Sequence, residues 1–112
     1  MSDDVVAVLQ RAKERVAAGW YQGGYALIDG ERYSGAGPFL VDDLARVQRV
    51  CAEGALWCEV GKDGLAFERA REFLQHIVGV RLIPDWNDAP GRTQAEVLDA
   101  FDAAIRLAKD SA

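Results

Sequence analysis

The chain has 112 residues, half of them hydrophobic and 28% charged, and its formal net charge is −5. This length suits one domain (residues 1–112) with a single hydrophobic core, and the composition excludes a disordered chain. An acidic surface repels phosphates, so direct nucleic-acid binding is not expected, whereas a basic protein partner would be attracted. Because no apolar run reaches about 18 residues and no signal-peptide pattern is present, we expect a cytoplasmic protein with no membrane contact.

The first predicted element is a helix over about Asp3–Ala18, where apolar residues recur at helical spacing until Gly19 ends the helix. Asp29-Gly30, flanked by apolar and aromatic residues, is typical of a hairpin turn, because a type I′ turn needs positive φ at both central residues. We therefore expect a short two-stranded hairpin over residues 26–33, followed by a loop at residues 34–38.

Two further helices are predicted in the middle of the chain. One runs over about Val41–Val60 and the next over about Leu65–Val78, each with an inward apolar stripe, and the segment 61–64 separates them. Residues 80–83 are expected to be extended, because Pro84 disfavours the α conformation in the residue before it.

The last predicted helix is the clearest element. A segment dense in turn-forming residues, 85–92, leads into a capping box. In this box the Thr93 hydroxyl accepts a hydrogen bond from the Glu96 amide, and the Glu96 carboxylate accepts one from the Thr93 amide. The helix then continues to about Lys109. The sequence as a whole predicts a mainly α fold: a small four-helix domain with a short β-hairpin between helices 1 and 2.

Three segments resemble a known family. They are residues 19–23 (Gly-Trp-Tyr-Gln-Gly), 51–56 (Cys-Ala-Glu-Gly-Ala-Leu) and 86–98 (Trp-Asn-Asp-Ala-Pro-Gly-Arg-Thr-Gln-Ala-Glu-Val-Leu). In that order they resemble a family of small bacterial and phage proteins described only as a domain of unknown function, over most of the chain from Val8 to Ala108. The chain departs from the family at Val50, where members often carry an aromatic residue. The resemblance implies a shared fold and a bacterial or phage origin, and it implies no activity.

The candidate site combines the first and the last of these segments. In a structural interpretation, a buried tryptophan, an Asn–Asp turn, an arginine ion pair and a threonine cap each have a sufficient role. In a functional interpretation, amide, carboxylate and guanidinium groups converge on a small polar molecule or on a peptide. The candidate ligand- or partner-binding residues are Trp20, Tyr21, Gln22, Trp86, Asn87, Asp88 and Arg92.

Catalytic and metal sites are weaker hypotheses. Cys51 and Cys58 are predicted to lie in the middle of one helix, about 10.5 Å apart along its axis, which exceeds the reach of about 7 Å for a disulfide. A cysteine nucleophile needs a base or a cationic setting, and the one histidine, His76, is on another predicted helix. The Cys/His spacing does not suit zinc, so no catalytic residue, metal or cofactor is expected.

Carboxylates can do acid–base chemistry or hold Mg²⁺, and Asp99 and Asp102 share a helix face. A solvated acidic face is the favoured explanation for them. The carboxylates considered are Asp42, Asp43, Asp85, Asp88, Glu96, Asp99 and Asp102.

Three functions remain open from the sequence. The leading hypothesis is a non-catalytic protein-interaction module that acts through an acidic helix face and the aromatic loop, which comprises residues 19–25. The alternative is a protein that binds a small polar ligand, a metabolite or nucleotide, between the Trp20–Gln22 loop and the Trp86–Arg92 turn. The third is a hydrolase-type enzyme that uses Cys51 or a carboxylate pair. A homodimer is possible if an apolar stripe stays uncovered after the helices pack.

Overall fold

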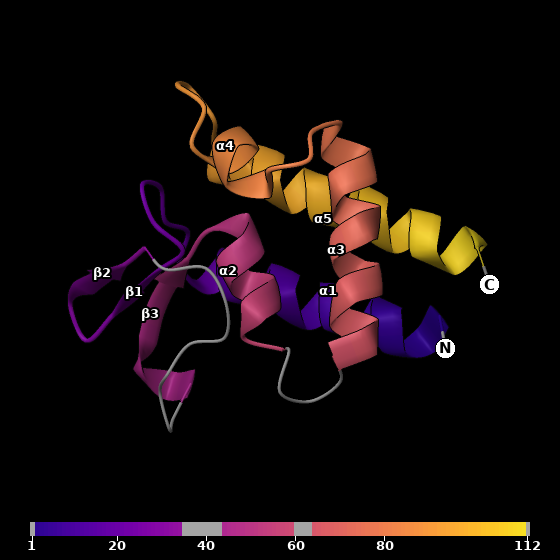
Figure 1. Cartoon of the computed structure of the whole chain (residues 1–112), viewed down its shortest axis with the longest axis horizontal. Coiled ribbons are helices and arrows are strands. Elements are labelled where there is room, and N and C mark those ends of the chain that lie inside the picture. The colour runs from indigo at the N-terminus through magenta and orange to yellow at the C-terminus, as the bar shows by residue number, and fades with distance from the viewer. Residues whose placement is uncertain (1, 35–43, 60–63, 112) are drawn as a thin grey trace.

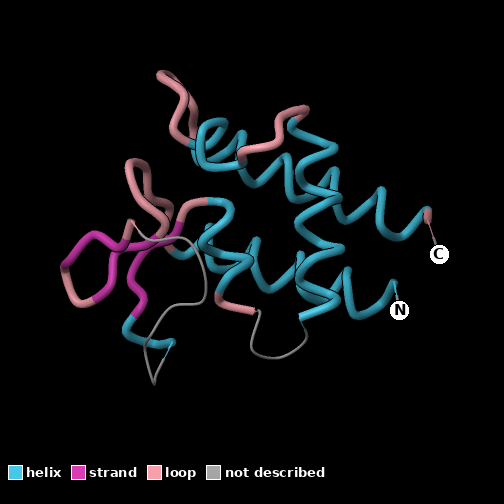
Figure 2. The backbone as a smooth tube through the Cα atoms, in the orientation of Figure 1, coloured by secondary structure: helices cyan, strands magenta, loops and turns pink. Residues whose placement is uncertain are grey.

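The computed structural model describes residues 2–34, 44–59 and 64–111 (Figures 1 and 2). In chain order its elements are α1 (Ser2–Ala18), β1 (Ala26–Ile28), β2 (Glu31–Tyr33), the 3₁₀ turn η1 (Leu44–Arg46), β3 (Val47–Val50), α2 (Ala52–Trp57), α3 (Gly64–Val78), α4 (Ile83–Asn87) and α5 (Gln94–Asp110). The described residues thus form a mainly helical fold with five α-helices and a small antiparallel sheet. No helix in these ranges is long and apolar enough to span a membrane.

The hydrophobic core lies where α1, α3 and α5 meet. α3 crosses both α1 and α5, and the start of α1 and the end of α5 lie at the same end of the molecule (Figure 1). Each helix buries large apolar side chains there: Leu9 and Val16 in α1, Leu74 in α3 and Phe101 in α5 are all fully covered. Burying a side chain of this size contributes about 1.5–3 kcal/mol, so these contacts dominate the packing.

The sheet lies at one end of the helical layer and has the order β2-β1-β3. β1 pairs antiparallel with both neighbours. The β1–β2 turn contains Asp29 and Gly30 with φ of 52° and 80°, as a type I′ turn requires. The predicted hairpin is therefore present, but it is part of a three-stranded sheet that was not predicted. Ala26 of β1 and Val50 of β3 are buried against the helices.

The predicted helix over Val41–Val60 is wrong. Residues 44–46 form η1, residues 47–50 form β3, and only Ala52–Trp57 is α-helical, while residues 41–43 and 60 lie outside the described part of the chain. The register explains the error: Ala26 is opposite Val50 and Ile28 is opposite Val47, with an irregularity between them. The extra residue of this β-bulge puts Val47 and Val50 on one face although they are three apart, a spacing that imitates a helix.

The segment around Pro84 also differs from the prediction. Ile83 to Asn87 form the short helix α4 instead of an extended stretch and a turn. Pro84 stands in the first turn, where its missing N–H removes no intrahelical bond, and this position allows a helix despite the proline. The α5 capping box is confirmed, with the Glu96 amide 3.2 Å from the Thr93 hydroxyl and the Thr93 amide 2.9 Å from the Glu96 carboxylate. The predicted loop over 34–38 lies outside the described residues after its first position.

Candidate functional site

Asn87 is the centre of the predicted site, and it is completely buried. Its side-chain carbonyl accepts hydrogen bonds from the Trp20 indole at 2.8 Å and from the Ala52 amide at 3.0 Å. Its side-chain NH₂ donates to the Tyr21 carbonyl and to the Asp88 carboxylate, both at 2.9 Å. An asparagine side chain offers two donors and two acceptor lone pairs, so all four are used by the protein itself.

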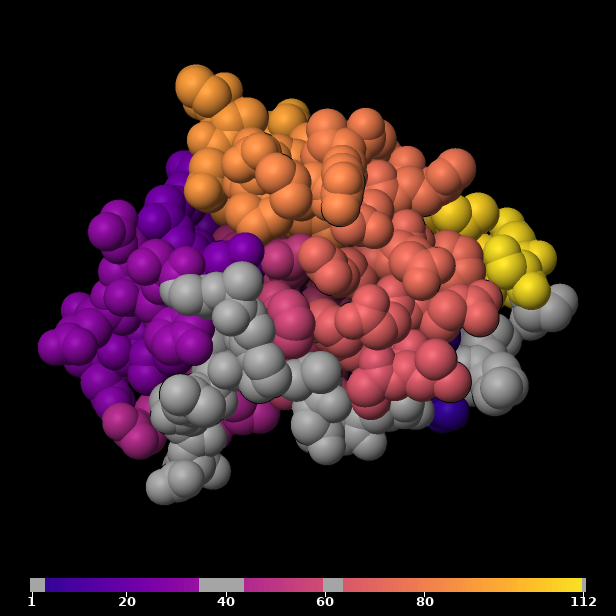
Figure 3. Space-filling view, in the orientation of Figure 1, coloured from indigo at the N-terminus to yellow at the C-terminus, as the bar shows by residue number. Residues whose placement is uncertain are grey.

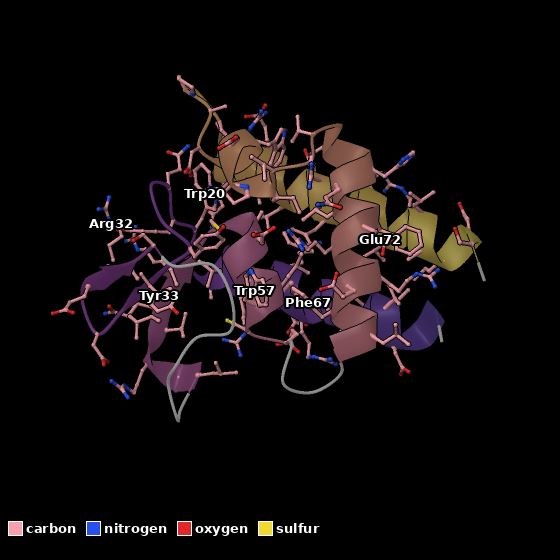
Figure 4. All side chains as sticks on the ribbon, in the orientation of Figure 1. Trp20, Arg32, Tyr33, Trp57, Phe67 and Glu72 are labelled. Atoms are coloured by element: carbon pink, nitrogen blue, oxygen red, sulfur yellow. The ribbon has the colours of Figure 1, made fainter. Side chains whose placement is uncertain are left out.

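Two more hydrogen bonds fasten the aromatic loop to α4. The Gln22 side chain donates to the Asn87 backbone carbonyl at 3.1 Å, and the Gly23 amide donates to the Asp88 carboxylate at 3.1 Å. Figure 4 shows Trp20 between the sheet and α4, and Figure 3 shows the two segments in contact on the surface. The structure therefore brings Trp20, Tyr21, Gln22, Asn87 and Asp88 together, and they bond chiefly to one another.

Arg92 is held against Trp86 of α4. Its Nε donates to the Trp86 carbonyl at 3.0 Å, and its guanidinium carbon lies 4.2 Å from the centre of the Trp86 ring, a cation–π contact. A further nitrogen lies 3.5 Å from the Glu96 carboxylate. The carboxylate partner expected for this arginine is therefore found, in the first turn of α5.

Cys51 was expected in the middle of a helix, but it is the N-cap of α2. Its sulfur accepts a hydrogen bond from the Gly54 amide at 3.2 Å. Cys58 is the C-cap of the same helix. Both thiols are buried. Burial raises the pKa of Cys51 to about 12, although the hydrogen bonds from the Gly54 and Glu53 amides act in the opposite direction. A thiol with this pKa is protonated at neutral pH and is a poor nucleophile.

Two buried glutamates were missed by the sequence reasoning. Glu53 is 3% exposed, and its carboxylate lies 3.0 Å from the Arg71 guanidinium and close to Tyr25. Burial first, and then the charge and hydrogen bond of Glu53, raise the pKa of Tyr25. The only signal for them in the sequence was their position, since Glu53 comes before and Glu59 after the apolar run around Leu56.

The second buried carboxylate, that of Glu59, is paired with Arg11 and lies 3.5 Å from Arg15. This cluster ties the end of α2 to α1. Both clusters join helices through ion pairs, and buried charges in proteins are usually compensated in this way. In the second cluster Glu59 Oε2 has an ion-pair contact with Arg15 but accepts no hydrogen bond among the described residues.

The acidic face predicted for α5 is partly neutralised. Asp102 bonds to Lys13 of α1 at 2.6 Å, while Asp99 is exposed. The two carboxylates considered for catalysis therefore have different surroundings. That of Asp102 is in an ion pair, and that of Asp99 faces solvent. Within residues 2–34, 44–59 and 64–111, no group of three or more His, Cys, Asp or Glu side chains is arranged to hold a metal ion. Asp42 and Asp43 lie outside these ranges.

A hollow of about 430 Å³ was not predicted, and it lies between α3 and the C-terminal end of α5. It is lined by Arg69, Glu72, Phe73, His76, Leu107 and Ser111. Arg69, Phe73 and His76 share one face of α3, because they are separated by three or four residues. His76 therefore contributes to this hollow.

One comparison with known proteins gave a match. A model of a family of unknown function (DUF6197) matches residues 1–107. No curated protein and no solved structure matches the chain. The family match spans nearly the whole length and includes α1, the sheet, the Asn87 hydrogen bonds and almost all of α5. The chain therefore belongs to this family of unknown function.

Proposed function

We propose that the protein is a non-catalytic protein-interaction module, of bacterial or phage origin and active in the cytoplasm. Its proposed contact surface is the loop–helix platform, which we define as residues 20–23 together with residues 85–92. The acidic residues exposed next to it and on α5 favour a partner with a basic contact surface.

The hydrogen bonding of Asn87 is the observation that supports this proposal most strongly. Because Asn87 fixes the Trp20 side chain, the Tyr21 backbone and the start of α2, the platform is ordered before any partner arrives. A preordered surface loses little conformational entropy on binding. A ligand placed between the two segments would instead have to displace these bonds.

The exposed groups of the platform suit protein contact. Gln22, Asp85 and Asp88 are exposed, and Tyr21 and Trp86 are partly exposed. Aromatic side chains surrounded by polar groups are common in the energetic centres of protein interfaces. Beside α4, the apolar side chains of Val80 and Leu82 are 40% and 56% exposed. These two residues widen the apolar part of the surface.

The experiment compares affinity capture from bacterial lysate with wild-type protein and with a Tyr21→Ala/Asp85→Lys variant. A matched control is Leu65→Ala/Glu72→Lys, which makes the same kinds of change at exposed positions of α3. We expect a stoichiometric partner with wild type and control, and its loss with the platform variant. Equal capture by all three proteins, or the absence of any stoichiometric partner, would refute the proposal.

A small polar ligand is a second candidate because of the hollow between α3 and α5. Its volume is within the range of ligand sites, about 300–1,000 Å³, and it combines an aromatic ring with Arg69 and His76. A thermal-shift screen of metabolites and nucleotides tests this candidate. A hit should stabilise wild type and lose its effect in Arg69→Ala/His76→Ala, whereas a screen without hits would count against a ligand.

A further inference from the structure

We propose that the outer face of the sheet docks an acidic amphipathic helix of a partner protein. The proposed site is the arginine face, which consists of Arg32 of β2, Leu27 of β1 and Arg49 of β3. It is a different surface from the loop–helix platform, so it can fail or succeed independently of the function proposed above.

The strand register puts these three side chains in one row. Leu27 is the partner of Arg32 on one side and of Arg49 on the other. Their neighbours Ala26 and Val50 point into the core, so the row points away from it. Adjacent strands lie about 4.8 Å apart, and the two arginine backbones are therefore separated by roughly 10 Å, with an apolar side chain midway.

Both arginines are exposed, and neither forms an ion pair with any residue in the described parts of the chain. The aliphatic stem of Arg32 lies over Gly24, and its guanidinium has one long contact of 3.4 Å with the Gly23 carbonyl. The stem of Arg49 lies against Gly19. Figure 4 shows Arg32 at the outer edge of the molecule. The stems are thus supported while the charged groups stay available.

Neighbouring groups extend the positive charge from the sheet to α1. Arg15 and Gln48 line, with Arg49, a hollow of about 60 Å³ between the end of α1 and β3. Arg15 shares Glu59 with Arg11. Within the described residues, the exposed Asp29 near the turn forms an ion pair with Arg46. The other exposed acid of the hairpin, Glu31, is next to Arg32 in β2 and therefore points to the opposite face of the sheet. A positive strip therefore crosses this end of a protein whose net charge is −5.

The spacing of the row favours a helix as the occupant. Seven residues of an α-helix rise about 10.5 Å, close to the separation of Arg32 and Arg49. Acidic residues seven apart would meet the two guanidinium groups, which bind carboxylates in a bidentate manner. An apolar residue three or four positions after the first acid would lie on the same helix face and meet Leu27.

Two other occupants fit less well. Nucleic acid requires a surface that neutralises many phosphates, and the strip offers few charges on a protein that repels polyanions overall. A second copy of this chain fits poorly because no described helix carries acidic residues seven positions apart. The acidic helix is therefore expected from another protein.

The test uses a fluorescein-labelled helical peptide with glutamates seven residues apart and leucine three residues after the first glutamate. Binding is measured by fluorescence anisotropy at low ionic strength. We expect Arg32→Glu/Arg49→Glu to weaken binding by roughly tenfold or more, because attraction becomes repulsion at both ends of the row. Leu27→Ser should weaken it by a smaller factor, and a peptide with glutamine in place of glutamate should not bind.

The control is Arg106→Glu/Lys109→Glu, which changes the net charge by the same amount at exposed positions of α5. It should bind the peptide nearly as well as wild type. Should the charge-reversed sheet variant fail to fold by circular dichroism, Arg32→Gln/Arg49→Gln replaces it. No binding by wild type, or equal loss in both double variants, would overturn the proposal. So would arginine-dependent binding of labelled oligothymidylate in place of the peptide.

Discussion

At the scale of single residues, Asn87 and Cys51 show how a polar group can be important for structure without being chemically active. Both are fully buried, and both bond to backbone amides at the start of α2. Asn87 supplies the contact between chain segments distant in sequence, whereas Cys51 closes a local turn. Neither side chain is poised for catalysis: Asn87 has no free hydrogen-bonding group, and Cys51 holds its proton.

Replacing Asn87 tests directly whether this single residue is the central contact between the segments. Asn87→Ala leaves the Trp20 indole and the Ala52 amide without their acceptor, and each unsatisfied buried group costs about 1–3 kcal/mol. We expect the free energy of unfolding, measured by urea denaturation, to fall by roughly 3 kcal/mol. Gln22→Ala, at an exposed neighbour, should cost well under half as much. Equal effects of the two substitutions would show that Asn87 is not the central contact.

Cys51 gives a pH dependence with a definite sign. Burial raises its pKa to about 12 in the folded protein, while a thiol in the unfolded chain ionises near pH 8.5. The contribution of this thiol to the free energy of unfolding is fully present below its pKa in the unfolded chain. It is lost as the pH rises toward 12. Cys51→Ser, which keeps a capping group, should lose less stability than wild type between pH 9 and 11. Parallel curves for the two proteins would contradict this assignment.

At the scale of elements, local chemistry made some parts predictable and tertiary contact hid others. The capping box at Thr93 and the Asp29-Gly30 turn depend on neighbours in sequence, and both were found from the sequence. β3 was missed because its bulge spaces Val47 and Val50 as a helix would. The contact between Asn87 and α2 spans 35 residues and left no local signal.

The junction between α1 and β3 depends on Gly19. A Cβ added there would lie 2.6 Å from the Gln48 carbonyl, and the Gly19 carbonyl accepts from the Val50 amide at 2.9 Å. Gly19→Ala should therefore push β3 away from α1 and cost about 1–3 kcal/mol. Urea unfolding and the amide proton exchange rate of Val50 measure both effects. Unchanged exchange at Val50 would mean that the backbones are not in close contact.

At the scale of the whole molecule, buried ion pairs connect the helical layers. Glu53 of α2 pairs with Arg71 of α3, and Glu59 at the end of α2 pairs with Arg11 and Arg15 of α1. The exposed charges are distributed unevenly, with a positive strip on the sheet and acidic groups around α4 and α5. This asymmetry is the basis for proposing two separate docking surfaces on one small protein.

Removing the partner of a buried carboxylate should weaken this connection. Arg71→Met leaves Glu53 buried without its guanidinium, and loss of one member of a buried pair costs about 3–5 kcal/mol. Since Arg71 itself is 30% exposed, we expect the lower end of this range. The double variant Arg71→Met/Glu53→Leu should regain much of the loss in thermal unfolding. A single variant as stable as wild type would show that the pair contributes little.

The central claim is that the loop–helix platform held by Asn87 is the surface for a protein partner. Chemical-shift mapping of ¹⁵N-labelled protein with the captured partner tests this claim most directly. We expect the largest shift changes at residues 20–23 and 85–92, with small changes along residues 69–76. Changes confined to residues 69–76 and the end of α5, with an unperturbed platform, would contradict it.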